Sequence, residues 1–217
     1  MDNKALRDLL LEGARKLDLE VSQSAADLLR RYAAELLRWN ARVNLTAITD
    51  PEEVVEKHLL DSLAIAPEVA GARSLLDVGC GAGLPGLPMK VFSPELSVVL
   101  VDAVAKKIGF VKAVAAGLGL QGVTALHRRL EGHPEAEGVA PAEVVVSRAF
   151  ANLETFVPLA RAYAAPGGRI IAMLGKAPAP APAASAAFQP ASLRRYSLPF
   201  SGAERHVAVF HVEHPRT

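Results

Sequence analysis

The stretch from Leu75 to Gly86, LLDVGCGAGLPG, holds residues whose types and spacing indicate chemistry. Four glycines follow a short apolar run, and an aspartate, Asp77, stands two residues before the first glycine. Glycines in a turn between a strand and a helix let the backbone approach a ligand closely and direct N–H groups at it. The stretch therefore predicts a small-molecule site at the end of a strand.

The glycines of this stretch can be counted in two ways. Counted from Gly81, the residues Gly81, Gly83 and Gly86 satisfy the pattern G-x-G-x-x-G of dinucleotide-binding sites. Counted from Asp77, the pattern is Asp-x-Gly-x-Gly-x-Gly, with Gly79 as the first residue of the turn. We favour the second count because a carboxylate at Asp77 suits a cationic amino-acid ligand better than a pyrophosphate.

A second acid supports this choice. Asp102 ends the next apolar run, VVLVD, where a carboxylate can accept hydrogen bonds from both hydroxyls of a ribose. The order of acid, glycine loop and acid is typical of sites for S-adenosylmethionine, which has a ribose and a charged amino-acid tail but no phosphate. We therefore expect this cofactor. Because sites for NAD share the second acid, a nicotinamide-dependent oxidoreductase stays as the alternative enzyme class.

The elements that position these residues alternate along the chain. Apolar, β-branched runs predict strands and the segments between them predict helices, which indicates right-handed βαβ units and a mostly parallel sheet. After the proline-rich stretch from Ala177 to Ser185, two alternating runs predict a terminal hairpin. The expected strands are Ser74–Val78, Val98–Asp102, Val123–His127, Glu143–Ser147 and Arg169–Leu174, with a hairpin of Leu193–Phe200 and His206–Glu213; the expected helices are Leu84–Phe92, Lys106–Leu118 and Leu153–Ala164.

The first part of the chain predicts helices, because apolar residues recur there at helical spacing. Ser22 is the expected N-cap of one of them. Asp50 and Pro51 mark the start of another, with Asp as N-cap and Pro at the first helical position. In that helix His58, Asp61 and Ser62 share a face, which we interpret as structural or RNA-facing, since one short helix cannot arrange a Ser/His/Asp triad.

Composition sets limits on partners and location. The chain has 217 residues, 51% of them hydrophobic and 22% charged, and a formal net charge of +1, which neither requires nor excludes a nucleic-acid partner. Its single cysteine, Cys80, permits no internal disulfide. We find no secretory signal, no run long enough to span a bilayer and no metal-ligand spacing, so we expect a cytoplasmic protein without a metal or a membrane partner.

Five stretches of the chain together resemble a known family. They are NLTAITDPEEVVEKHLLDSLAIAP (residues 44–67), LLDVGCGAGLPGLP (75–88), LVDAVAKK (100–107), VSRAFANL (146–153) and GAERHVAVF (202–210). In this order they resemble the glucose-inhibited division protein B family, the bacterial guanine-N7 methyltransferases of small-subunit ribosomal RNA. Two departures are visible: the order Leu174-Gly175-Lys176 replaces the usual Lys-Gly, and the Ala-Pro run replaces a charged helix.

The resemblance implies a class I S-adenosylmethionine-dependent methyltransferase fold of the α/β class. This fold is Rossmann-like, with a seven-stranded, mostly parallel sheet whose last strand is antiparallel. We expect an N-terminal helical extension over residues 1–70 and the methyltransferase domain over residues 71–217. The implied activity is methylation of N7 of a guanosine in 16S ribosomal RNA, with the RNA or the small subunit as partner and the protein as a monomer. A non-catalytic ribosomal RNA-binding assembly factor is a third alternative.

The residue types fit N7 chemistry. Guanine N7 is a lone pair without a proton, so direct in-line methyl transfer needs alignment but no general base. The signature Asn/Asp-Pro-Pro-aromatic of amino-group methyltransferases is replaced by Ser147-Arg148-Ala149-Phe150, and Cys80 lies in the cofactor loop rather than at the place of a nucleophile. Arg148 is the candidate that positions the guanine O6 or the methionine carboxylate, and Phe150 either stacks on the base or lies in the core.

The candidate site residues divide into two sets. The expected cofactor contacts are Asp77, Gly79, Gly81, Gly83, Leu84, Asp102, Ala103, Leu130, Glu131 and Arg148. The expected RNA contacts are Lys106, Lys107, Arg129, Lys176 and Arg205, which can pair with phosphates.

Overall fold

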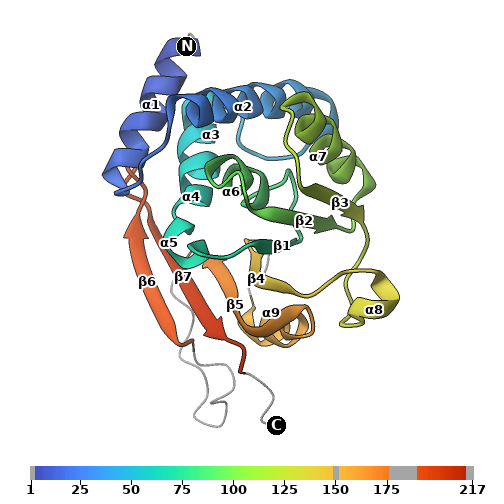
Figure 1. Cartoon of the computed structure of the whole chain (residues 1–217). Coiled ribbons are helices and arrows are strands. Elements are labelled where there is room, and N and C mark those ends of the chain that lie inside the picture. Colours follow the sequence, from blue (N-terminus) through green and yellow to red (C-terminus); the bar gives the residue numbers. More distant parts are fainter. Residues whose placement is uncertain (1–2, 149–151, 176–189, 214–217) are drawn as a thin grey trace.

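A computed structural model of the chain describes residues 3–148, 152–175 and 190–213. These residues form a seven-stranded sheet with the strand order β3-β2-β1-β4-β5-β7-β6 (Figure 1). Strands β1 to β5 pair in parallel, and β7 is antiparallel to both of its neighbours. The predicted mostly parallel sheet with an antiparallel last strand is therefore confirmed. The strands are β1 (Ser74–Val78), β2 (Ser97–Asp102), β3 (Val123–His127), β4 (Ala142–Ser147), β5 (Ala164–Leu174), β6 (Ser192–Ser197) and β7 (Glu204–His211).

Helices cover both faces of the sheet. Neighbouring strand residues point to opposite faces, so Leu75 belongs to one hydrophobic core and Leu76 to the other. The first core joins α1 (Asn3–Lys16), α2 (Gln23–Val43), α6 (Gly86–Phe92) and α7 (Ala105–Gly117) to the sheet, and the second joins α9 (Leu153–Arg161). The N-terminal helices thus bury their apolar sides against the same sheet face as α6 and α7 (Figure 1).

Two predicted helix starts have the expected caps. The Ser22 side chain accepts a hydrogen bond from the backbone N–H of Ala25 at 3.1 Å. The Asp50 carboxylate accepts from the N–H groups of Glu52 and Glu53 at the start of α3 (Pro51–Val54). These bonds satisfy N–H groups that have no partner within the helix.

The apolar periodicity predicted a regular α-helix after Asp50. The structure shows an irregular helix instead. After α3 it continues as a π-helical turn, Val55–Leu60, and then as α4 (Asp61–Leu63). A short helix, α5 (Ala66–Val69), follows it. Because a π-helical turn widens the helix, it changes the direction of the side chains that follow, and such turns are frequent at functional sites.

Several element boundaries differ from the predictions. Helix α6 begins at Gly86 rather than Leu84, and an additional single turn, α8 (Pro134–Glu137), follows β3. Strand β5 begins at Ala164 and includes Pro166, Gly167 and Gly168, whereas the predicted strand began at Arg169. The strand passes through these residues because Gly168 permits close approach: a Cβ there would lie 2.9 Å from the carbonyl oxygen of Glu143.

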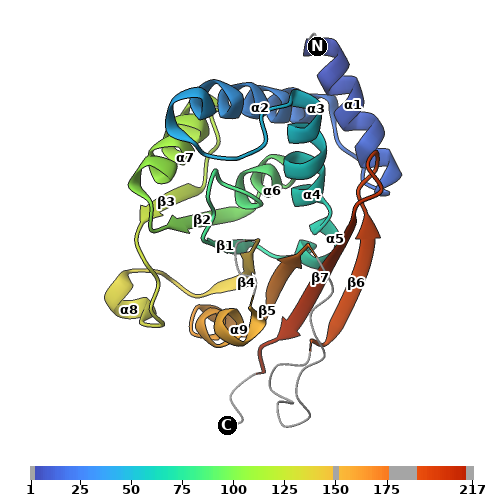
Figure 2. The same ribbon diagram turned by 180° about the vertical axis from the view of Figure 1, so that it is seen from behind.

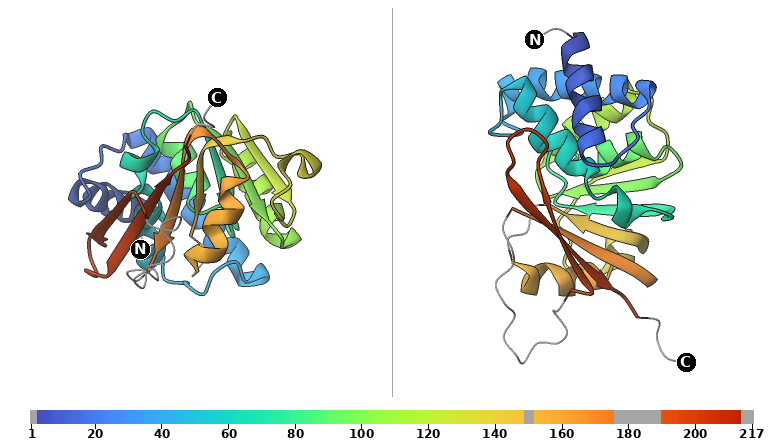
Figure 3. Two further views of the ribbon diagram at one scale, coloured as in Figure 1. Left: turned by 90° about the horizontal axis from the view of Figure 1, so that it is seen from below. Right: turned by 90° about the vertical axis from the view of Figure 1, so that its left-hand side faces the viewer.

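The terminal hairpin is attached to the N-terminal helices. The buried Glu56 carboxylate accepts hydrogen bonds from the N–H groups of Phe200 and Ser201 in the β6–β7 turn, both at 2.7 Å. Arg194 of β6 forms an ion pair with Glu68 of α5 at 2.6 Å. Figures 2 and 3 show this turn reaching the helices at the N-terminal end of the chain. The contacts therefore connect the two ends of the chain beside the first core.

Candidate functional site

The glycine loop follows β1 as predicted. The N–H groups of Gly79 and Cys80 both donate to the carbonyl of Val101, which fixes the loop to the end of β2. Gly79, Gly81 and Gly83 all have positive φ, a conformation that side chains with a Cβ rarely adopt. A Cβ on Gly81 would meet nothing within 4 Å, whereas one on Gly83 would lie 2.7 Å from Leu87. Gly81 thus faces open space, and Gly83 allows the loop to pack on α6.

Asp77 lies fully buried beneath this loop. Its Oδ2 accepts a hydrogen bond from the N–H of Gly86 at 2.8 Å, while its Oδ1 has no partner among the described residues. Burial raises the pKa of Asp77 to about 7, against the opposing effects of the Gly86 hydrogen bond and of Arg148. The site therefore contains a buried carboxylate oxygen that a hydrogen-bond donor or a cation would satisfy.

Asp102 stands at the end of β2, opposite the loop. Its Oδ2 accepts from the N–H of Gly81 at 2.9 Å and its Oδ1 from the N–H of Val104 at 2.8 Å. The Lys107 ammonium lies 3.9 Å from Oδ2. A carboxylate has about four lone-pair positions, so these backbone bonds leave capacity for two further donors.

A cavity of about 190 Å³, here called the loop cavity, opens beside the glycine loop. Four of the expected cofactor contacts line it: Gly79, Gly81, Leu84 and Arg148. Lys107, an expected RNA contact, lines it too, which places this lysine on the cofactor side. The complete lining is Leu45, Thr46, His58, Gly79, Cys80, Gly81, Ala82, Leu84, Lys107 and Arg148.

A second cavity of about 320 Å³, here called the basic cavity, shares His58 and Arg148 with the loop cavity. Four elements supply its other polar side chains: the π-helical turn, α4, β6 and β7. Its lining is Ile48, Lys57, His58, Asp61, Arg148, Met173, Leu174, Gly175, Tyr196 and Arg205. The expected RNA contact Arg205 therefore lies next to the expected cofactor site.

Arg148 lies between the two cavities, just after β4. Its guanidinium donates to the Lys57 carbonyl at 3.1 Å and lies 3.5 Å from an oxygen of Asp61. It also lies 3.4 Å from Nδ1 of His58. The π-helical turn therefore holds this arginine through a backbone carbonyl and through side chains that come from the turn and the residue after it.

His58 is neutral in this setting. Burial, together with the nearby Arg148 charge, lowers the pKa of His58 to about 4. Its Nε2 lies 2.8 Å from the hydroxyl of Thr46, which joins the turn to the loop after α2. At neutral pH the imidazole ring is therefore uncharged, and it lines both cavities.

Asp61 gathers groups from three strands. Its Oδ1 accepts from the Tyr196 hydroxyl of β6 at 2.7 Å and lies 3.7 Å from Arg205 of β7, while Arg148 follows β4. The carboxylate is buried, and burial together with this anion raises the pKa of the Tyr196 phenol. Asp61 thus holds two arginines at the basic cavity.

Three residues that shape this site were not predicted from the sequence. The Asn40 side chain binds the N–H groups of Leu45 and Thr46 and the carbonyl of Thr46, which fixes the segment that lines the loop cavity. The buried Tyr32 donates to the carbonyl of Ala82 at 2.7 Å. Asn40 occupies a buried position one turn after the core residue Leu36, and a polar residue at an apolar helix position is a signal that could have indicated it. Tyr196 carried no such signal.

The other predicted residues of the described part of the chain do not line these two cavities. Ala103 accepts from the His127 ring, and the Arg128 N–H donates to the Asp102 carbonyl, so the segment that holds Leu130 and Glu131 begins beside β2. Leu130 is buried, whereas Glu131 is exposed. The expected RNA contacts Lys106 and Arg129 are exposed on the surface. Two candidates, Phe150 and Lys176, fall outside the described residues.

Comparisons with known proteins agree with this arrangement. A family model described as GidB, rRNA small subunit methyltransferase G, matches residues 25–208. The ribosomal RNA small subunit methyltransferase G of Myxococcus xanthus strain DK1622 is 56% identical over 97% of this chain and 99% of its own length. The protein of the same name from Anaeromyxobacter dehalogenans strain 2CP-C is 51% identical over 94% of this chain and 96% of its own length.

Solved structures share the fold at low sequence identity. An O-methyltransferase from Bacillus cereus in complex with SAH has a TM-score of 0.57 and 18% identity, covering 84% of this chain and 91% of its own. The S-adenosylmethionine-dependent methyltransferase SibL has a TM-score of 0.57 and 16% identity, covering 98% of this chain and 76% of its own. The fold is that of the class I methyltransferases. The chain belongs to the GidB family, that of the rRNA small subunit methyltransferase G.

Proposed function

We propose that the protein methylates N7 of a guanosine in 16S ribosomal RNA, with S-adenosylmethionine as the methyl donor and without a general base. The observation that carries the proposal is the pair of adjoining cavities. The loop cavity is lined by the glycine turn, the basic cavity by cationic and aromatic side chains, and Arg148 belongs to both. Family membership supplies the class of substrate.

The residues of the loop cavity fit the proposed cofactor. The buried Asp77 Oδ1 has no partner among the described residues and would accept from the cofactor's ammonium group, directly or through water. Asp102 has the capacity to accept from ribose hydroxyls while keeping its bonds to the backbone. A cofactor with a pyrophosphate would instead bring negative charge toward these two carboxylates. This argues against the nicotinamide alternative.

The protein's part in the reaction is alignment. The cofactor supplies an electrophilic methyl group on a sulfonium, and guanine N7 presents a lone pair that needs no deprotonation. We assign Arg148 the role of orienting the reactants, because its guanidinium borders both cavities and can donate to guanine O6 or to the cofactor's carboxylate. His58 takes no part in proton transfer in this proposal, since its low pKa keeps it neutral and its Nε2 is paired with Thr46.

The RNA is assigned to the side of the basic cavity. Arg205 lines this cavity, and Lys106 and Arg129 are exposed on the surface. In keeping with a ribosomal RNA substrate, the proposal includes a cytoplasmic, monomeric enzyme. No helix within the described part of the chain is both long and apolar enough to cross a bilayer.

The proposal is tested by incubating small subunits and naked 16S rRNA with tritiated S-adenosylmethionine. We expect label in at least one substrate, and strand scission specific to N7-methylguanosine should locate it at one nucleotide. A matched comparison uses Arg148→Gln, expected to reduce transfer strongly, and Arg73→Gln, an exposed arginine away from both cavities, expected to leave it unchanged. Absence of label in both substrates would support the non-catalytic RNA-binding alternative, and label at a different base atom would refute N7.

A further inference from the structure

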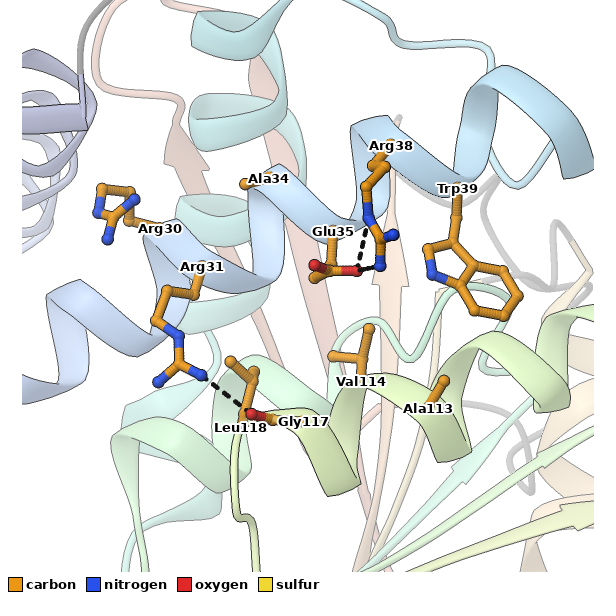
Figure 4. Close-up of a pocket in the computed structure, with 10 residues that line it drawn as sticks. All are labelled: Arg30, Arg31, Ala34, Glu35, Arg38, Trp39, Ala113, Val114, Gly117 and Leu118. Carbon is orange, nitrogen blue, oxygen red and sulfur yellow. Dashed lines mark hydrogen bonds and ion pairs between the residues drawn. The ribbon is translucent and has the colours of Figure 1, made fainter.

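A groove of about 280 Å³ lies between α2 and α7, away from both cavities of the candidate site. Figure 4 shows Arg31 and Trp39 of α2 extending toward α7, with Arg30 and Arg38 on the same helix, and residues of α7 and its C-cap forming the other side. Its lining is Arg30, Arg31, Ala34, Glu35, Arg38, Trp39, Ala113, Val114, Gly117 and Leu118. None of the proposed cofactor or RNA contacts belongs to it.

Positive charge is concentrated on this helix. The sequence of α2 contains four arginines and two acids, so α2 alone has a formal charge of +2, whereas the whole chain has +1. The α7 side of the groove carries no charged side chain. Within the lining, three arginines face a single acid, Glu35, which is paired with Arg38, and outside the lining Asp27 lies 3.9 Å from Arg30. The groove is therefore a local cationic site on a nearly neutral protein.

Arg31 is the best-defined cation in the groove. It donates to the carbonyl of Gly117 near the C-terminal end of α7 at 2.9 Å, a bond that holds the guanidinium in place. Among the described residues, no carboxylate lies within ion-pair distance of Arg31. A guanidinium has five N–H donors, so this single backbone bond leaves the others for a second ligand. The charge is thus pre-oriented and not neutralised.

The α7 side of the groove allows a ligand to approach the helix closely. Ala113 and Gly117 of α7 are exposed, and a Cβ on Gly117 would meet nothing within 4 Å. At one end of the groove, Trp39 packs edge-on against Phe110 with ring centroids 5.6 Å apart, which fixes the indole. Arginine side chains beside an uncharged helix surface match the phosphate backbone of a nucleic acid.

The same two helices connect the groove to the candidate site. Leu45 and Thr46, which follow the end of α2, line the loop cavity. Helix α7 begins beside Asp102, and its Lys107 lines the same cavity. Arg31 precedes the end of α2 by twelve residues, which is about 18 Å along a helix. A folded ribosomal RNA can span this distance while one of its nucleotides occupies the site.

We infer that the groove between α2 and α7 is a second RNA-docking site, in which Arg30, Arg31 and Arg38 bind backbone phosphates of ribosomal RNA. This inference rests on the proposed function, since it assigns the RNA a contact far from the methylated base. The groove would contribute to the affinity for the RNA and to its orientation rather than to base recognition, because phosphate contacts carry no sequence information of their own.

The test measures binding of a 16S rRNA transcript by fluorescence anisotropy at several salt concentrations. Ala113→Glu places a negative charge in the groove without removing a side-chain contact, and Ala116→Glu makes the same change at an exposed position of α7 outside the lining. At about 0.1 M salt, losing one phosphate contact should weaken binding roughly five- to eightfold and lower the salt slope by about 0.7–0.9. We expect this for Ala113→Glu and a much smaller effect for Ala116→Glu.

A second pair of variants keeps the test decisive if Ala113→Glu fails to fold. Arg31→Gln and Arg15→Gln each remove an arginine that donates to a backbone carbonyl on a helix surface, but only Arg31 faces the groove. Arg31→Gln should raise KM for RNA and leave kcat and the affinity for S-adenosylhomocysteine unchanged. Arg15→Gln should change none of these quantities.

The outcomes separate this inference from the proposed function. If the wild type binds and methylates rRNA but Ala113→Glu and Arg31→Gln bind it as tightly as their controls, the groove is not an RNA site. If these variants bind naked rRNA normally and lose affinity for intact small subunits alone, the occupant is a ribosomal protein and the inference is wrong. If the wild type neither binds nor methylates rRNA, the proposed function itself fails.

Discussion

Asp77 gives the sharpest test of the site, because its charge state and its proposed role are coupled. Burial raises the pKa of this carboxyl from 3.8 to about 7. The folded protein therefore keeps a proton that the unfolded chain releases between about pH 4 and pH 7. By linkage, the contribution of Asp77 to the free energy of unfolding falls as the pH rises through this interval, by at most about 4 kcal/mol.

In the free protein, burial favours the protonated form of Asp77, and binding of the proposed cofactor should favour the ionised form instead. An ammonium group near the buried Oδ1 favours the ionised carboxylate, so binding near pH 7 should release a fraction of a proton. With a pKa of about 7 in the free protein, affinity should fall roughly fivefold from pH 7 to pH 6 and about tenfold per pH unit below that.

The assay is isothermal titration with S-adenosylhomocysteine from pH 5.5 to 7.5, in two buffers of different ionisation enthalpy. Asp77→Asn is the matched variant, because its amide oxygen can still accept from the Gly86 N–H while the ionisable group is removed. We expect the variant to bind more weakly, to bind with little dependence on pH and to release no proton. Equal pH dependence in wild type and Asp77→Asn would refute the assignment of the ammonium group to Asp77.

Three further predictions concern the same framework. Asp102→Ala should weaken S-adenosylhomocysteine binding by about 2–4 kcal/mol, as expected for two lost ribose hydrogen bonds, and unchanged affinity in titration would show that the ribose lies elsewhere. Ser22→Ala should lower the free energy of unfolding by about 1 kcal/mol in urea, because Ala25 loses its cap, and a change near zero would show that water replaces the cap fully. Glu56→Gln should cost about 1–3 kcal/mol in the same assay by weakening the charge-assisted bonds to the β6–β7 turn, whereas the exposed Glu53→Gln serves as the control and should cost much less.

The fold was largely predictable because its determinants are local. Strand runs, the caps at Ser22 and Asp50 and the glycine turn each depend on a few neighbouring residues, and the structure bears them out. The start of β5 was not predictable in this way. The sequence Pro-Gly-Gly usually interrupts a strand, but the approach of Glu143 from the neighbouring strand makes Gly168 suitable at this position.

The site was predictable in part, for the same reason. The loop residues and Asp102 follow from a short motif, and the structure brings Gly79, Gly81, Leu84 and Arg148 to one cavity. The π-helical turn has no periodicity signal of its own, so its effect on His58 and Asp61 could not be foreseen. The roles proposed for these residues, and the boundary between the helical extension and the catalytic domain, remain predictions.

Asp61 explains why the basic cavity was not found from sequence. The carboxylate comes from α4, and its partners Arg148, Tyr196 and Arg205 come from segments more than eighty residues further along the chain. Such a cluster exists only once the hairpin is attached to the N-terminal helices through Glu56 and Arg194. The hairpin therefore does more than complete the sheet, because it places Tyr196 and Arg205 beside Asp61. Asp61 in turn holds Arg148 where the two cavities meet.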